Sequence, residues 1–122
     1  MPEQPPAHFE CIDPILRVED MSVSVRYNVD VLGFEKASWG NDDFTHMGRD
    51  GKGIYLCRGG QGHTGGWVWI GVDDVRALHE TYKARGAIIR QDPRNEPWGL
   101  EMRIEDPDGN VLRFGSDPEG RA

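Results

Sequence analysis

The sequence predicts an α+β domain made of two βαβββ modules, which form a curved mixed sheet with a cleft. The first observation is a set of landmarks that recur in the same order at nearly constant spacing. Val18-Glu19-Asp20 returns as Val72-Asp73-Asp74, Gly33 as Gly86, and Asp50-Gly51 as Asp108-Gly109. The second is that strand and helix patterns follow the same order around both sets. Such a repeat indicates an internal duplication. Each half is too small to fold alone, so the two must share a core.

The chain of 122 residues has the size of one domain. We expect one folded domain over residues 8–115, between a disordered tail at 1–7 and a flexible tail at 116–122. The expected parts of this domain are module one at 8–58, a glycine-rich linker at 59–66 and module two at 67–115.

In module one, the segment from Cys11 to Val18 has the pattern of a strand. Asp20 is a good helix N-cap and Gly33 a good residue to end a helix. The valines between them alternate as in a strand, yet they also fit one face of a helix. We choose a helix because of the two caps and the clearer pattern in module two. Further strands are expected at Phe34–Trp39, Asp43–Met47 and Ile54–Arg58.

Module two begins with a strand pattern at Trp67–Val72. Asp74 then caps a helix in which Val75, Leu78 and Tyr82 share one face, and Gly86 ends it. The remaining expected strands are Ala87–Arg90, Leu100–Glu105 and Val111–Gly115. Asp50-Gly51 and Asp108-Gly109 are typical of hairpin turns.

Strand alternation divides the side chains between two faces. The apolar register should pack on the helices: Leu16, Val18, Ile54, Leu56, Val68, Ile70, Met102, Ile104, Leu112 and Phe114. The other register should point away and line a cleft with tryptophan and charge: Asp13, Arg17, Tyr55, Cys57, Trp67, Trp69, Glu101, Arg103 and Arg113.

Composition excludes several classes of function. With 14 Lys and Arg against 21 Asp and Glu, the net charge is −7, whereas nucleic-acid binding needs a basic surface. No apolar run approaches the roughly 20 residues of a membrane helix, and we expect no membrane partner. Two cysteines and no secretory signal favour the reducing cytoplasm. The acidic charge serves solubility, or attracts a cationic ligand.

The layout resembles the vicinal oxygen chelate superfamily of glyoxalases, bleomycin-resistance proteins and dioxygenases. The segments that carry the resemblance are Pro14–Asp20, Val31–Phe34, Gly71–Val75 and Glu105–Asn110. Other segments are similar to its bleomycin-binding branch: Asp42–Phe44, Trp67–Trp69, Glu96–Gly99 and Gly109–Gly115. Members of that branch bind the drug unaltered, as dimers with clefts at the subunit interface. The resemblance therefore implies a homodimer here, with exchange of the N-terminal strands about Pro14 as one arrangement.

Metal-dependent members of the superfamily place one ligand on each of four strands. The matching positions here are Asp13, Tyr55 or Cys57, Trp67 and Arg113. An indole N–H cannot ligate a cation and a guanidinium would repel one. The resemblance thus implies a lost metal site, no cofactor and no catalytic residue, and it favours a protein that is not an enzyme. The histidines lack metal-binding spacing, and structural or solvated roles are favoured for them: His8, His46, His63 and His79.

Several aromatic residues are candidates for ligand binding. Trp67 and Trp69 lie two apart and so face one side of their strand, for stacking or for burial at an interface. Trp98 follows Pro97 in a loop, which favours contact with a planar ligand. Trp39 and Phe44 lie near one rim of the predicted cleft, where local packing is the alternative. The Tyr55 hydroxyl is available to a ligand or to a neighbouring strand.

The charged candidates are Glu101, Arg103 and Arg113, which could equally pair among themselves. The resulting hypothesis is a non-enzymatic protein that sequesters a small aromatic or cationic, drug-like molecule. The alternative is a metal-dependent glyoxalase-like lyase or isomerase, or an extradiol-type dioxygenase, with His46 or His63 as ligands from a shifted register. A third hypothesis is a domain whose cleft binds a metabolite or a partner.

Overall fold

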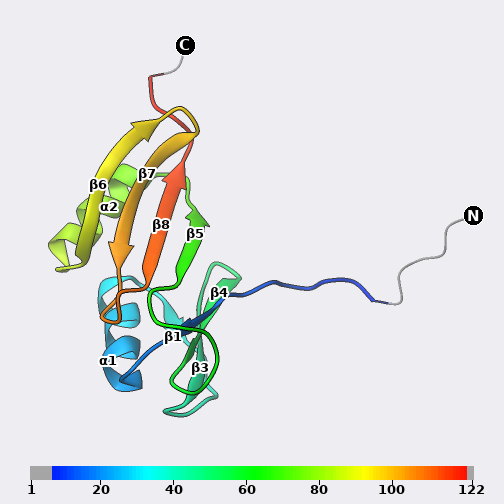
Figure 1. Ribbon diagram of the computed structural model, residues 1–122. Helices are drawn as coiled ribbons and strands as arrows, with labels where there is room; N and C mark the ends of the chain where they lie inside the picture. The colour runs from blue at the N-terminus through cyan, green and yellow to red at the C-terminus, as the bar shows by residue number, and fades with distance from the viewer. Residues whose placement is uncertain (1–6, 121–122) are drawn as a thin grey trace, which may run out of the picture.

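The computed structural model describes residues 7–120, and the expected tail residues 1–6 and 121–122 lie outside this range. The described chain forms two four-stranded sheets, each with a helix on one face (Figure 1). This confirms the predicted α+β class. The strands form two separate sheets rather than one continuous sheet, because no ladder joins β1 or β5 to the other module.

Module one contains β1 (Ile15–Arg17), α1 (Met21–Arg26), β2 (Glu35–Lys36), β3 (Phe44–Arg49) and β4 (Lys52–Cys57). A π-helical segment, Tyr27–Val31, continues α1. The sheet order is β1-β4-β3-β2, with β1 parallel to β4 and the other pairs antiparallel. The predicted helix is confirmed: the Asp20 carboxylate accepts a hydrogen bond from the Val23 N–H at 3.2 Å.

Module two contains β5 (Trp67–Gly71), α2 (Val75–Ala84), β6 (Ile88–Glu96), β7 (Gly99–Glu105) and β8 (Val111–Ser116). Its order, β5-β8-β7-β6, repeats that of module one strand for strand. The Asp74 carboxylate caps α2 by accepting a hydrogen bond from the Ala77 N–H at 3.0 Å. The two βαβββ modules are therefore confirmed.

The edge strands differ most from their predicted bounds. Of the predicted strand at Cys11–Val18, Ile15–Arg17 form the ladder with β4, and Pro14 and Val18 each add one backbone hydrogen bond to it. Residues 7–12 leave the body as an extended segment (Figure 1). The predicted strand at Phe34–Trp39 shrinks to Glu35–Lys36. By contrast, β6 continues well past Arg90, through Pro93. Proline is tolerated there because β6 is an edge strand with register shifts.

The core contains the predicted apolar register of both modules.

Two tyrosines join the modules, each bonding the backbone of the other module. The Tyr27 hydroxyl of module one donates to the Glu105 carbonyl at 2.6 Å and accepts from the Ile88 N–H at 2.9 Å. The Tyr82 hydroxyl of α2 donates to the Leu32 carbonyl at 2.7 Å. Burial raises the pKa of Tyr82 to about 12, because the charged phenolate is poorly solvated there. Within residues 7–120, no helix has the length and apolar character needed to cross a membrane.

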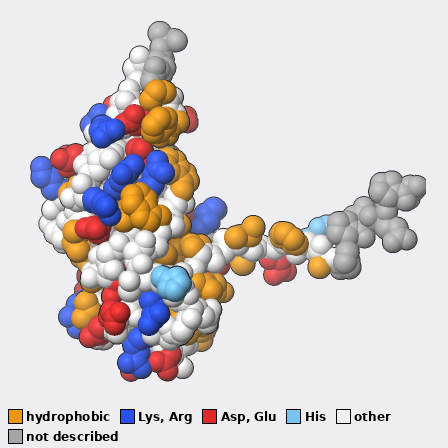
Figure 2. All heavy atoms as spheres, in the orientation of Figure 1, with side chains coloured by type: hydrophobic (Ala, Val, Ile, Leu, Met, Phe, Trp, Pro, Cys, Tyr) orange, Lys and Arg blue, Asp and Glu red, His pale blue; other side chains and the backbone are white. Residues whose placement is uncertain are grey.

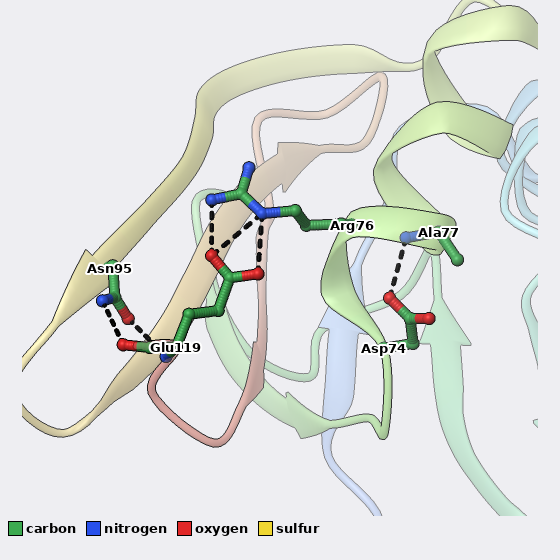
Figure 3. Close-up of polar contacts among 5 residues, drawn as sticks. All are labelled: Asp74, Arg76, Ala77, Asn95 and Glu119. Carbon is green, nitrogen blue, oxygen red and sulfur yellow. Dashed lines mark hydrogen bonds and ion pairs between the residues drawn. The ribbon is translucent and has the colours of Figure 1, made fainter. Parts of the chain in front are cut away.

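The residues after β8 are bonded to module two, where the sequence predicts a flexible tail from residue 116. Ser116 is the last residue of β8. Glu119 then forms an ion pair with Arg76 of α2 at 2.7 Å, and its backbone exchanges two hydrogen bonds with the Asn95 side chain (Figure 3). We call this contact the C-terminal clamp. It ties the last described residues to α2 and to the β6 edge.

Candidate functional site

The face of the second sheet that points away from α2 carries the predicted tryptophans and charges. We call it the tryptophan–arginine face; it comprises Trp67, Trp69, Arg90, Gln91, Glu101, Arg103 and Arg113. Strand register arranges it in rows. Trp69, Arg113, Arg103 and Gln91 form one row, and Gly71, Gly115, Glu101 and Arg94 form the next. The strand register places the predicted outward-facing residues of module two on one face: Trp67, Trp69, Glu101, Arg103 and Arg113.

Trp67 lies beside two guanidinium groups. The Arg90 and Arg103 guanidinium carbons are each 5.2 Å from its ring centroid. Cations at this distance from an indole are attracted by the electron-rich ring face. The indole is 49% exposed, so part of its surface is open to solvent. The arrangement is a positively charged surface with an aromatic ring in it.

Trp69 lies across β8, with its ring over Gly115. A Cβ at Gly115 would overlap the six-membered part of this indole, so only glycine leaves room for the ring. The Arg113 guanidinium carbon is 5.2 Å from the Trp69 centroid. The same arginine donates to one Glu101 oxygen from Nε at 2.9 Å and from a terminal nitrogen at 2.7 Å. Glu101 is only 1% exposed, so this ion pair compensates a buried carboxylate.

The corresponding face of the first sheet is aromatic. We call it the aromatic face; it comprises Trp39, Phe44, His46 and Tyr55, with Asp13 at its edge. Phe44 and Tyr55 are stacked, with centroids 5.0 Å apart, and Trp39 lies 6.2 Å from Tyr55. These three predicted candidates therefore meet in one cluster. The first sheet offers flat apolar surface where the second offers charge.

His46 completes the aromatic face. Its ring meets Tyr55 edge-on at 4.7 Å, and its Nε2 is 3.4 Å from an Asp13 carboxylate oxygen. A Cβ at Gly53 would occupy the position of the imidazole, so this glycine makes room for the ring. His46 is thus packed among aromatic side chains, which agrees with the structural role favoured by the sequence.

Trp98 is not part of either cluster. It lies in the turn between β6 and β7, at the end of the sheet opposite Trp67, and is 62% exposed. Two hollows in the described surface border α1, one of about 400 Å³. None of the predicted ligand-binding residues lines either hollow. Within one chain, the predicted site residues therefore lie on two sheet faces, apart from these two hollows.

The positions that match the metal ligands of relatives do not form a donor set for a cation in one chain. Trp67 is flanked by two arginines, and Arg113 is paired with Glu101. Across residues 7–120, no three His, Cys, Asp or Glu side chains are grouped closely enough to hold an ion. The residues present thus fit a metal poorly.

Sequence reasoning did not single out Arg90 or Gln91, and it gave His46 no place beside the aromatic candidates. Arg90 is the last residue of its expected strand, and Gln91 lies after the expected end of that strand. Their places became visible only with the extended β6 and its pairing to β7. One signal for His46 was available, because Phe44 and His46 are two apart and therefore share a strand face.

Comparison with known proteins agrees with this fold. The profile of the Glyoxalase/Bleomycin resistance protein/Dioxygenase superfamily matches residues 7–114. The chain belongs to this superfamily. No curated protein sequence matches it.

Several solved structures of this fold resemble the chain. The bleomycin-binding protein from bleomycin-producing Streptomyces verticillus, complexed with copper(II)-bleomycin, is 29% identical, with a TM-score of 0.76 over 93% of this chain and 99% of that one. TnmS3, an antibiotic binding protein from Streptomyces sp. CB03234, is 21% identical, with a TM-score of 0.78 over 94% and 99%. Lactoylglutathione lyase from Agrobacterium tumefaciens is 17% identical, with a TM-score of 0.73 over 89% and 95%. At the last two identities, the likeness shows the fold alone.

Proposed function

We propose that this protein binds and sequesters a small aromatic, drug-like molecule without changing it. The observation that carries the proposal is the tryptophan–arginine face, on which Trp67 and Trp69 are about half exposed and are held beside guanidinium groups. Indoles in such a setting offer flat surface to a planar ligand. Each stacked aromatic pair contributes roughly 0.5–1.5 kcal/mol beyond the area it buries.

Two further points support binding rather than turnover. The positions matching the metal ligands of relatives hold an indole and an ion-paired guanidinium, which are poor ligands for a cation. The solved structure with 29% identity is a bleomycin-binding protein in complex with copper(II)-bleomycin. On this proposal the aromatic face contributes Trp39, Phe44 and Tyr55, and the second sheet contributes Trp67, Trp69, Glu101, Arg103 and Arg113. Trp98 joins them from a second subunit.

We also propose that the binding cleft forms between two copies of the chain. The aromatic and tryptophan–arginine faces carry half-exposed tryptophans in one chain, and the predicted site residues do not line either of the two hollows beside α1. Residues 7–12 extend from the body, with Phe9 92% exposed and Ile12 85% exposed (Figure 1). Apolar side chains on an extended segment favour burial against another chain. Pro14 is the hinge of this arrangement.

Sedimentation equilibrium of the full chain should give a dimer, and a monomer at micromolar concentration would refute the dimeric cleft.

The binding proposal is tested with bleomycin and with the neutral aromatic compound 2-naphthamide. Binding is followed by isothermal titration calorimetry for bleomycin and by saturation-transfer NMR for the small probe. A compound of this size is expected to bind with about millimolar affinity. Trp67→Ala and Trp69→Ala should weaken naphthamide binding, and mass spectrometry should recover both compounds unchanged.

Lys83→Ala, a change on α2 away from both faces, is the control for these variants. Chemical conversion of either compound would contradict the proposal. So would binding of neither compound, or naphthamide binding that both tryptophan variants leave unaltered. If only bleomycin fails to bind, the ligand is another aromatic molecule.

A further inference from the structure

Three buried side-chain nitrogens within residues 7–120 lack a hydrogen-bond partner: Arg17 Nε, Gln91 Nε2 and Arg103 Nε. All three are donors. Gln91 and Arg103 lie directly opposite each other on β6 and β7, so their side chains share the tryptophan–arginine face. Buried polar groups in folded proteins are normally bonded. An unmet pair of donors on one face therefore indicates that an acceptor from outside the chain belongs there.

The ion pairs around this face also leave one described cation without a carboxylate partner. Arg113 is paired with Glu101 at 2.7 Å, Arg94 with Glu96 at 2.6 Å and Arg90 with Glu105 at 3.5 Å. Arg103 forms no ion pair with any described carboxylate. It carries a full positive charge at pH 7, since arginine is not deprotonated in proteins. The missing acceptor should therefore be negatively charged.

The unpaired guanidinium lies beside an aromatic ring. The Arg103 guanidinium carbon is 5.2 Å from the centroid of Trp67, and the Arg90 guanidinium carbon lies at the same distance. Figure 2 shows Lys and Arg side chains gathered around hydrophobic ones over the face of the β5–β8 sheet. A ring stacked against Trp67 would carry its substituents within reach of these cations. Guanidinium groups bind carboxylate and phosphate oxygens through paired hydrogen bonds.

We propose that Arg103, Gln91 and Arg90 form an anion subsite beside Trp67, so that the ligand is a planar aromatic acid. Its class is an aryl ring bearing a carboxylate, a phosphate or a sulfonate. This inference rests on the proposed binding function and adds the charge of the ligand. It differs from the cationic ligand suggested by the net charge of −7, because a ligand responds to the local field of its site.

The test compares three probes with the same ring and different charge: 2-naphthoate, neutral 2-naphthamide and 2-naphthylmethylammonium. Dissociation constants of the full chain are measured by NMR titration at low and at high salt. Naphthoate should bind about tenfold more tightly than the ammonium probe, and added salt should reduce this preference. Arg103→Gln should abolish the preference of naphthoate over the ammonium probe, because the charged contact is lost.

Arg103→Lys, which keeps the charge, should retain part of the preference. Arg85→Gln, at the end of α2, is the matched control and should change nothing. Circular dichroism checks that each variant is folded. If naphthamide binds through the tryptophans but naphthoate shows no advantage, or keeps it in Arg103→Gln, the anion subsite is wrong and the binding function stands. If none of the three probes binds, both proposals fail.

Discussion

The two sheets have the same strand order and the same relation to a helix, yet their outer faces hold different chemistry. On the first sheet, rings pack against one another, and the His46 ring nitrogen lies 3.4 Å from an Asp13 carboxylate oxygen. On the second sheet, each indole lies beside a guanidinium group, and the guanidinium beside Trp69 is paired with the buried Glu101 carboxylate. The core register is equivalent in both modules because both must pack on a helix. The outward-facing residues do not have to pack on a helix, so they can differ between the modules and can serve function.

The largest expected effect concerns the buried ion pair of the second sheet. Arg113→Met should lower the free energy of unfolding by about 3 kcal/mol, because it leaves the buried Glu101 carboxylate without a counter-charge. Asp13→Asn on the first sheet should cost less than about 1 kcal/mol, since the Asp13–His46 contact is longer than the Glu101–Arg113 pair and the Asp13 side chain is more exposed than that of Glu101. Urea unfolding measures both.

A double variant, Arg113→Met with Glu101→Leu, serves as the control and should recover most of the lost stability, since no charge then remains buried. Equal losses for Arg113→Met and Asp13→Asn would show that the two faces do not differ in how they hold charge.

A second contrast uses matched glycines. Gly53→Ala should lower the free energy of unfolding by about 1–3 kcal/mol, because the new Cβ meets the His46 ring and lies 2.6 Å from the Met47 carbonyl oxygen. Gly115→Ala should cost less, because each of the nearest atoms belongs to the Trp69 side chain, which can swing outward. Thermal unfolding and tryptophan fluorescence distinguish these effects. A larger loss at Gly115 would mean that the Trp69 ring is as fixed as the backbone.

A third prediction concerns the two tyrosines whose hydroxyl groups each bond the backbone of the other module. Tyr82→Phe should cost about 1 kcal/mol, because the buried Leu32 carbonyl loses its donor. In the wild type, the pKa of Tyr82 is raised to about 12, above the value of about 10 for an unfolded chain. The stabilising contribution is therefore complete below pH of about 10 and is lost as pH rises towards 12.

Alkaline titration of the tyrosinate absorbance checks this prediction. Tyr27→Phe is the counterpart in module one, where burial also raises the pKa of the phenol. Titration of every tyrosine near the ordinary value would contradict the buried position of Tyr82.

The smallest expected effect is on the C-terminal clamp, which has no counterpart in module one. Glu119→Ala should leave the melting temperature almost unchanged, because both side chains of the pair are about half exposed to solvent. The pKa of Glu119 is lowered by its bonds to Arg76, so the contribution of the pair is present above the ordinary glutamate pKa and is lost at lower pH. An NMR titration of the Glu119 carboxylate should show the pKa rise to its ordinary value in Arg76→Ala, and an unchanged value would exclude the clamp in solution.

Much of the fold was predictable because local physics decides it. Asp20 and Asp74 both cap helices as expected, and alternation separated Leu112 and Phe114 from Arg113 correctly. The edge strands were less predictable, because their length depends on a neighbour. The segment from Cys11 has a strand pattern, but its ladder with β4 is limited to Ile15–Arg17.

The candidate site was predictable as a set of residues and not as an arrangement. Trp67 and Trp98 lie at opposite ends of one sheet, although both are plausible ligand contacts in sequence. The association of Trp67 with Arg90 and Arg103 depends on how β5, β6 and β7 are placed about β8. Such proximity between distant segments leaves no trace in the spacing of residues.

By itself, the sequence determined the two modules, the helix caps and the side of each strand on which every residue lies, because these follow from periodicity and hydrogen bonding within a few residues. Only the tertiary structure decided which outward-facing residues meet. Strand pairing brings together segments far apart in the chain, and its register sets whether Arg103 lies beside a carboxylate or beside an indole with its charge unpaired.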